Sequence, residues 1–133
     1  MNNAIAKSLQ SARELDLTTT GRASGQPRTV ELWFAFDDGK LYFLAHEDSD
    51  WWKNIAKSAE VEVAVSEIVF TGTARLIQEK LTHVFGLFRK KYGDSQVERW
   101  YSGSRSQRRA VEVELLRVLG KRPTGKTLLE VAI

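Results

Sequence analysis

The chain has 133 residues, a length typical of one domain, and its 42% hydrophobic and 28% charged residues are ordinary for a globular protein. It has no cysteine and only two histidines, which excludes disulfides and thiolate metal ligands and leaves no metal-binding set. No apolar run approaches the roughly 18 residues of a membrane span, and the N-terminus lacks the apolar core of a secretory signal. We therefore expect one cytoplasmic domain over residues 1–133 with no membrane partner.

Apolar spacing and turn signals predict four elements in the first third of the chain. Apolar residues within 4–12 recur at helical spacing, and residues 15–20 form a threonine-rich strand. Residues 28–36 alternate as a half-buried strand, and an Asp-Asp-Gly turn joins them to a return strand over 40–46. One face of the 28–36 strand is apolar and carries Val30, Leu32, Phe34 and Phe36. Trp33 lies on the other face, where we expect it to be exposed and available to an interface.

The middle of the chain predicts one helix and two strands. A polar N-cap precedes a helix over residues 51–58. Residues 60–66 alternate strictly, and residues 68–77 follow as another strand. Gly72 inside that second strand indicates a bulge or a close approach by a ligand or another backbone.

The last third of the chain predicts helices followed by a long strand. The clearest helix covers residues 79–92, with an apolar stripe formed by Leu81, Val84, Phe85, Phe88 and Tyr92. A short helical piece follows it, carrying Val97, Trp100 and Tyr101. A polar loop leads to a strand over 110–119, after which 120–126 reads as a turn and 128–133 as a further short strand.

The order of these elements indicates the fold class. Six or seven strands follow one another with hairpin signals instead of alternating with long helices. That pattern favours a mainly antiparallel sheet or small barrel with short helices outside it.

The segment TTTGRASGQPR runs from the end of the first predicted strand to the start of the second, and it carries more hydroxyls and cations than a hairpin needs. It can be a solvated connection with ordinary surface charges. It can also be an anion cradle, because the threonine hydroxyls donate hydrogen bonds and Arg22 and Arg28 offer planar donors suited to phosphate. Gly21 and Gly25 would let the backbone turn sharply and approach a ligand closely.

The same stretch, continued as LTTTGRASGQPRTVELWF, resembles the signature of the deazaflavin (F420)-dependent nitroreductase family. That family lies within the FMN-binding split-barrel group, which includes the pyridoxamine-5'-phosphate-oxidase-like proteins. The hairpin DDGKLYFLA, the segment DWWKNI and the strand EVEVAV follow in the family's order. The likeness covers residues 15–76, and beyond them it is one of general pattern.

The resemblance implies a split β-barrel of about six antiparallel strands with short outer helices, usually a homodimer. It implies FMN or the deazaflavin coenzyme F420 as cofactor, and a hydride passed between that cofactor and a small electrophile such as a quinone, nitro or unsaturated compound. It also implies two groups of cofactor-binding residues. The first is Thr20, Arg22, Ser24, Gly25, Arg28, Thr29 and Val30, and the second is His46, Trp51, Trp52, Lys53 and Asn54, with Ala45 beside it.

The sequence departs from the family between its third strand and the following helix. Deazaflavin-binding relatives often have a longer loop there with glycine and lysine, whereas this chain has only the acidic HEDSD. Those carboxylates would repel the polyanionic glutamyl tail of F420. The choice between FMN and F420 therefore stays open at this stage.

Other residues permit more than one role. Tyr101 could donate a proton to a reduced substrate, since an ordinary tyrosine is protonated at neutral pH. The basic runs at 89–91 and at Arg105, Arg108 and Arg109 could be solvated, or could grip a cofactor tail or a nucleic acid. Two other functions therefore remain open beside the oxidoreductase: a non-enzymatic binder of a flavin or similar flat anion, and a single-stranded nucleic-acid-binding barrel. The net charge of +3 suits a small anion at least as well as a nucleic acid, so we expect no nucleic-acid partner.

Overall fold

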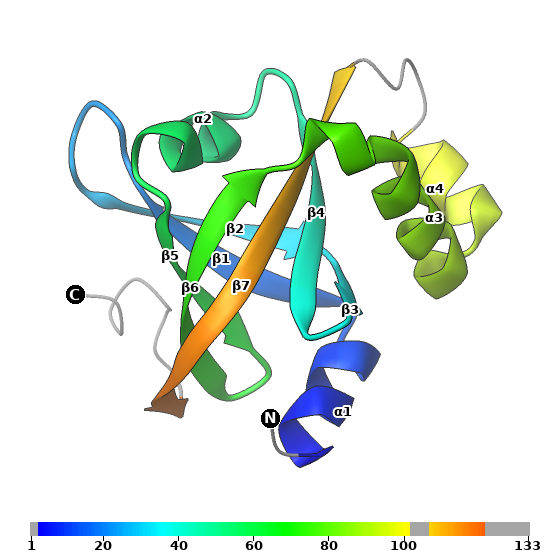
Figure 1. Cartoon of the computed structure of the whole chain (residues 1–133), viewed down its shortest axis with the longest axis horizontal. Helices are drawn as coiled ribbons and strands as arrows, with labels where there is room; N and C mark the ends of the chain where they lie inside the picture. The colour runs from blue at the N-terminus through cyan, green and yellow to red at the C-terminus, as the bar shows by residue number, and fades with distance from the viewer. Residues whose placement is uncertain (1–2, 102–106, 122–133) are drawn as a thin grey trace.

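The computed structural model describes residues 3–101 and 107–121 (Figure 1). In these ranges seven strands form one antiparallel sheet: β1 (Glu14–Thr20), β2 (Pro27–Trp33), β3 (Ala35–Asp37), β4 (Lys40–His46), β5 (Glu60–Val65), β6 (Ile68–Leu76) and β7 (Arg108–Lys121). The helices are α1 (Asn3–Ser11), α2 (Asp50–Lys57), the 3-10 turn η1 (Gln78–Lys80), α3 (Leu81–Tyr92) and α4 (Asp94–Tyr101). No helix in these ranges is long and apolar enough to cross a membrane.

The strand order explains why the sheet curls into a barrel. The order is β2-β1-β5-β6-β7-β4-β3, so β2 and β3 are the two edge strands. These edges are joined in sequence by Phe34 alone, because β2 ends at Trp33 and β3 begins at Ala35. A flat seven-stranded sheet could not bring its edges that close, so the sheet wraps around its own apolar face. The expected split barrel is confirmed.

The expected single strand over 28–36 is wrong, because Phe34 interrupts it. The Tyr92 hydroxyl accepts a hydrogen bond from the Phe34 amide (3.0 Å) and lies 2.8 Å from the Phe34 carbonyl oxygen. Lys91 Nζ also donates to that carbonyl, at 2.9 Å. Side chains of α3 thus replace the strand partners of Phe34 and let the chain turn from one edge of the sheet to the other.

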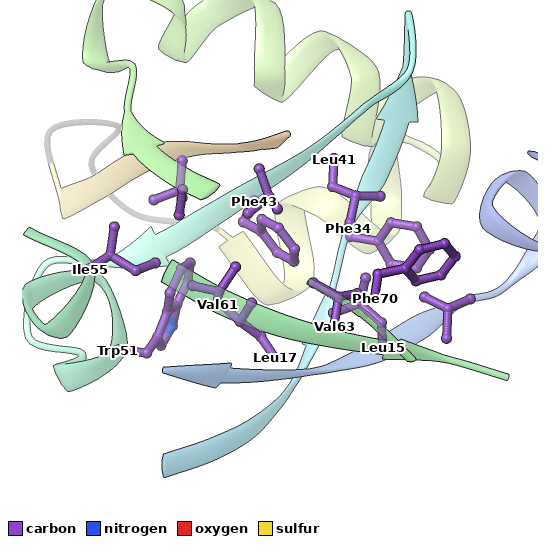
Figure 2. Packing of buried hydrophobic residues seen from close by; sticks show 14 of the residues in the cluster. Leu15, Leu17, Phe34, Leu41, Phe43, Trp51, Ile55, Val61, Val63 and Phe70 are labelled. Carbon is purple, nitrogen blue, oxygen red and sulfur yellow. The ribbon is translucent and has the colours of Figure 1, made fainter. Parts of the chain in front are cut away.

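The expected apolar face of this stretch is confirmed. Phe34 is fully buried in the main core, and Val30, Leu32 and Phe36 pack against it. The core lies inside the barrel, where side chains from β1, β4, β5 and β6 interdigitate with Trp51 and Ile55 of α2 (Figure 2).

A second cluster covers the outer face of β4. It includes the stripe of α3 and Val97 of α4, packed on Ala35, Tyr42 and Leu44. Trp33 is half-buried at its margin, so the expectation that it is exposed is wrong. Its ring stacks on Tyr92 at 4.2 Å between centroids with 17° between planes, because α3 packs on this face of the strand.

The remaining expectations concern strand ends. The β6–β7 pairing shifts register between Thr71 and Gly72, so the bulge indicated by Gly72 is confirmed. Strand β7 is longer than expected and includes residues 120 and 121, where a turn was predicted. The strand expected over 128–133 lies outside the described residues.

Candidate functional site in the seam between β2 and β4

The loop between β1 and β2 is fastened to helix α2. The Arg22 guanidinium donates to Asn54 Oδ1 (2.9 Å) and pairs with Asp50 (3.1 Å), and the Arg22 amide donates to the same Asn54 oxygen (3.1 Å). Asn54 is 3% exposed and its amide nitrogen donates to Thr19 Oγ1 at 3.2 Å. Lys57 Nζ donates to the Arg22 carbonyl at 2.8 Å. The hydrogen bonds that Arg22 donates thus hold the loop on α2. The side chain of Asn54 takes part in the same contact, because its oxygen accepts from Arg22 and its nitrogen donates to Thr19.

The other predicted residues of this loop and strand have different surroundings. Ser24 Oγ accepts from the Gln26 amide within the loop, at 3.1 Å. The exposed Arg28 guanidinium donates to the neighbouring Pro27 carbonyl at 3.4 Å. Thr29 and Thr18 share a hydroxyl–hydroxyl hydrogen bond of 2.8 Å across β1 and β2. Val30 packs against the core.

A first cavity, of about 600 Å³, opens beside this loop. Thr20 and Gly25 line it, together with Glu60, Glu62 and Arg117. Burial raises the pKa of Glu62, and its Oε2 is buried without a hydrogen-bond partner among the described residues. Two carboxylates against one guanidinium make this cavity a poor cradle for a phosphate.

A second cavity, of about 380 Å³, lies where the barrel is split. Among residues 3–101 and 107–121, strand β2 pairs only with β1, and beyond Tyr42 strand β4 pairs only with β7. Within these ranges no ladder therefore joins the edges of β2 and β4. We call this opening the seam cavity. Its lining is Glu31, Leu32, Trp33, Leu44, Ala45, His46, Ser49, Trp51, Trp100, Tyr101 and Arg108.

Aromatic rings make the walls of the seam cavity. Trp33 and Tyr101 lie 6.0 Å apart between centroids, and the Tyr101 ring meets Phe88 edge-on at 5.3 Å. Trp51 is 6% exposed and packs edge-on against Phe43 at 5.8 Å. Trp100 is 58% exposed. The rings of Trp33, Trp100 and Tyr101 offer flat apolar surfaces to a flat ligand ring, whereas Trp51 is almost fully packed.

The cation in the lining is Arg108, whose guanidinium carbon lies 4.6 Å from the Tyr101 ring centroid. It donates to the Trp100 carbonyl at 3.3 Å. Burial lowers the pKa of Arg108, although a guanidinium still keeps its charge. Burial also raises the pKa of Tyr101 well above its ordinary value, so this hydroxyl stays protonated and can donate a hydrogen bond. The cavity therefore joins a fixed positive charge to a neutral phenol.

The end of β4 and helix α2 supply the remaining predicted residues. His46 and Trp51 line the seam cavity. Trp52 donates its indole N–H to the Glu47 carbonyl at 3.1 Å, and Lys53 lies 6.0 Å from the Trp52 ring. Neither Trp52 nor Lys53 is in the cavity lining.

One arginine in each basic run is paired with carboxylates. Arg89 lies 2.7 Å from Glu98 and 3.6 Å from Asp94. Arg109 pairs with Glu47 at 3.5 Å. Arg105 lies outside the described residues.

Of the residues singled out from the sequence, His46, Trp51, Tyr101 and Ala45 line the seam cavity, and the rest of its lining was not selected. That remainder is Glu31, Leu32, Trp33, Leu44, Ser49 and Trp100, together with Arg108, which was raised only within a basic run. The alternation of β2 and the Trp100-Tyr101 pair were available signals. These local signals could not show that β2, β4 and α4 meet in the folded protein.

The fold is that of the split-barrel class, which includes pyridoxamine-5'-phosphate-oxidase-like proteins and F420 reductases. The sequence model of the F420H(2)-dependent quinone reductase family matches residues 1–105, and the chain belongs to this family. It is therefore a deazaflavin-dependent oxidoreductase, and the resemblance stated from the loop motif is confirmed.

Solved structures support the fold. An F420 reductase matches with a TM-score of 0.66 at 16% identity, over 89% of this chain and 98% of that chain. The heme storage protein HutZ from Vibrio cholerae matches with a TM-score of 0.72 at 14% identity, over 89% and 92%. A protein described as a domain-swapped dimer matches with a TM-score of 0.63 at 27% identity, over 77% and 80%.

Proposed function

We propose that the chain binds coenzyme F420 in the seam cavity and reduces a small electrophile there, such as a quinone, nitro or unsaturated compound. The observation that carries this proposal is that aromatic rings and the Arg108 guanidinium line the same cavity at the open seam of the barrel. The coenzyme supplies the hydride when bound. The first cavity is the weaker candidate because two carboxylates, Glu60 and Glu62, line it against one guanidinium, whereas the seam cavity has one carboxylate, that of Glu31, beside Arg108.

The chain's own residues would have separate tasks. Trp33 and Tyr101 would hold a flat ring by stacking, and Arg108 would balance its negative charge. Thr29 lies on the same face of β2 as Glu31 and Trp33, so a cofactor phosphate group that extended from the cavity along this face would reach Thr29. The buried phenol of Tyr101 would donate a hydrogen bond to the acceptor, because its raised pKa makes full transfer of its proton unfavourable.

We also propose that the protein works as a homodimer. Strand β7 exposes Leu116, Val118 and Leu119, which are 60%, 48% and 43% accessible. Within the described residues, β7 pairs with β4 only through Glu114, so its last part has an open edge on that side. Apolar side chains beside an open strand edge are typical of a surface that pairs with another chain.

The test of the site is a binding titration with coenzyme F420 and with FMN, comparing wild type with Arg108→Met and Arg117→Met. The first variant removes the guanidinium of the seam cavity, and the second removes that of the first cavity. We expect Arg108→Met to weaken F420 binding roughly tenfold or more, and Arg117→Met to leave it unchanged. The opposite pattern would place the cofactor in the first cavity.

The test of the activity is turnover of the reduced coenzyme with a simple quinone and with a nitroaromatic compound. Oxidation of the coenzyme that depends on the acceptor supports the reductase. Tight binding without turnover by any acceptor would instead support a storage or carrier role on the same scaffold.

A further inference from the structure

The turn after β4 fixes the state of His46, the histidine in the seam cavity. The Asp48 backbone amide donates a hydrogen bond to His46 Nδ1 at 3.1 Å. A backbone amide can only donate, so Nδ1 must be the unprotonated acceptor of a neutral imidazole. The proton then resides on Nε2, the other ring nitrogen.

The geometry leaves that Nε2–H for a ligand. Among the described residues, Nε2 has no hydrogen-bond partner. The imidazole ring lines the seam cavity, and the His46 side chain is 38% exposed. His46 is paired in register with Arg108 on β7, so a neutral donor lies beside the fixed charge of the same cavity. Trp51 and Ser49 complete that corner of the lining.

The turn around His46 is itself well held. The Ser49 amide donates to the His46 carbonyl at 3.0 Å, and the Glu47 amide donates to the Gln107 carbonyl at 2.7 Å. The Asp48 carboxylate lies 3.7 Å from Nδ1, and its side chain is 87% exposed. Backbone bonds therefore set the ring's tautomer, and the Asp48 side chain is not needed for it.

From this arrangement we propose that His46 Nε2–H donates a hydrogen bond to a carbonyl or ring-nitrogen acceptor of the deazaflavin ring. This inference rests on the proposed function, and it assigns to His46 a specific atom, protonation state and contact. Because the donor is fixed before binding, it costs no reorganisation when the cofactor enters.

A first experiment uses the cofactor-free protein. The chain has two histidines, so ¹⁵N-detected spectra with a His83→Gln variant assign both rings. We expect His46 near neutral pH to show an unprotonated Nδ1 and a protonated Nε2. Addition of F420 should shift the His46 Nε2 signal. The signals of His83, which is on α3 and lies near Asp37 of β3, should not change. The reverse tautomer, or an unmoved His46 signal at saturation, would overturn the proposal.

A second experiment compares bound-cofactor spectra and affinities of His46→Leu, His46→Gln and Asp48→Asn. The His46→Leu variant removes the hydrogen-bond donor, and His46→Gln replaces it with a side-chain amide N–H of similar reach. The Asp48→Asn variant removes the carboxylate but keeps the backbone amide that donates to Nδ1. We expect His46→Leu to shift the absorption of bound F420 and to weaken binding roughly fivefold to tenfold. His46→Gln should recover much of both effects, and Asp48→Asn should match wild type.

Two results would contradict the role of His46. Equal spectra and affinities in all variants would show that the imidazole makes no contact. Equal losses in all three would show that only the shape of the turn matters. Failure of wild type itself to bind F420 would refute the proposed function, and it would be seen before any variant is compared.

Discussion

Lys91 shows how one residue's surroundings decide its charge. Its ammonium donates to the Phe34 carbonyl and lies 3.6 Å from the Phe34 ring centroid. Within the described part of the chain no carboxylate is in ion-pair range of it. Burial, together with the neighbouring Arg13, lowers the pKa of Lys91 from its ordinary 10.5 to about 8. The strand break at Phe34 is therefore held by a cation that is costly to keep charged.

This cost predicts a dependence of stability on pH. Between about pH 8 and 10.5 the unfolded chain holds the Lys91 proton and the folded chain has released it. The free energy of unfolding of wild type should then rise with pH in that window relative to Lys91→Met, by about 1 to 3 kcal/mol. Urea unfolding of both proteins at pH 7 to 10.5 measures the difference. Parallel curves for the two proteins would rule out the shifted pKa.

At the scale of elements, the β6–β7 pair depends on a glycine. A Cβ built on Gly72 would lie 2.8 Å from Val113 Cγ1 and 3.1 Å from the Glu114 carbonyl oxygen. Both contacts are on β7, at the register shift that bends the sheet around the barrel. The strand pair can approach this closely only because position 72 has no side chain.

Gly72→Ala should therefore destabilise the protein by about 2 kcal/mol or more, because β7 must shift to admit a methyl group. Gly86→Ala is the matched control: its Cβ meets nothing within 4 Å and the residue is on helix α3. That variant should be neutral or up to about 1 kcal/mol more stable. Chemical denaturation compares the two, and a neutral Gly72→Ala would show that the bulge can relax.

At the scale of the whole molecule, the exposed apolar end of β7 predicts how copies associate. Replacing Leu116 and Val118 together by glutamate places four carboxylates across a two-fold interface, which should dissociate the dimer. Sedimentation velocity at several concentrations should show a monomer for this variant and a dimer for wild type. Lys90→Glu, an exposed change on α3, is the control and should stay dimeric. A monomeric wild type would refute the dimer.

Much of the fold could be predicted because local pattern and tertiary packing agree. The alternating strand over 60–66, the stripe on 79–92 and the apolar face of 28–36 all pack inward as their periods require. The break at Phe34 could not be predicted, because its hydrogen-bond partners lie 57 and 58 residues away on α3. Neither could the half-burial of Trp33, which depends on the same helix.

The sequence by itself determined the antiparallel barrel and, through its loop motif, the resemblance to a deazaflavin-binding family. Both could be predicted because they depend on residues close together in the sequence: the spacing of apolar residues, the turn residues and a contiguous motif. The tertiary structure alone decided that Arg22 fastens the loop to α2 and that the aromatic cavity opens at the seam. A site assembled from β2, β4, α4 and β7 has no contiguous signature, because its residues become neighbours only when the sheet curls and leaves two edges unpaired.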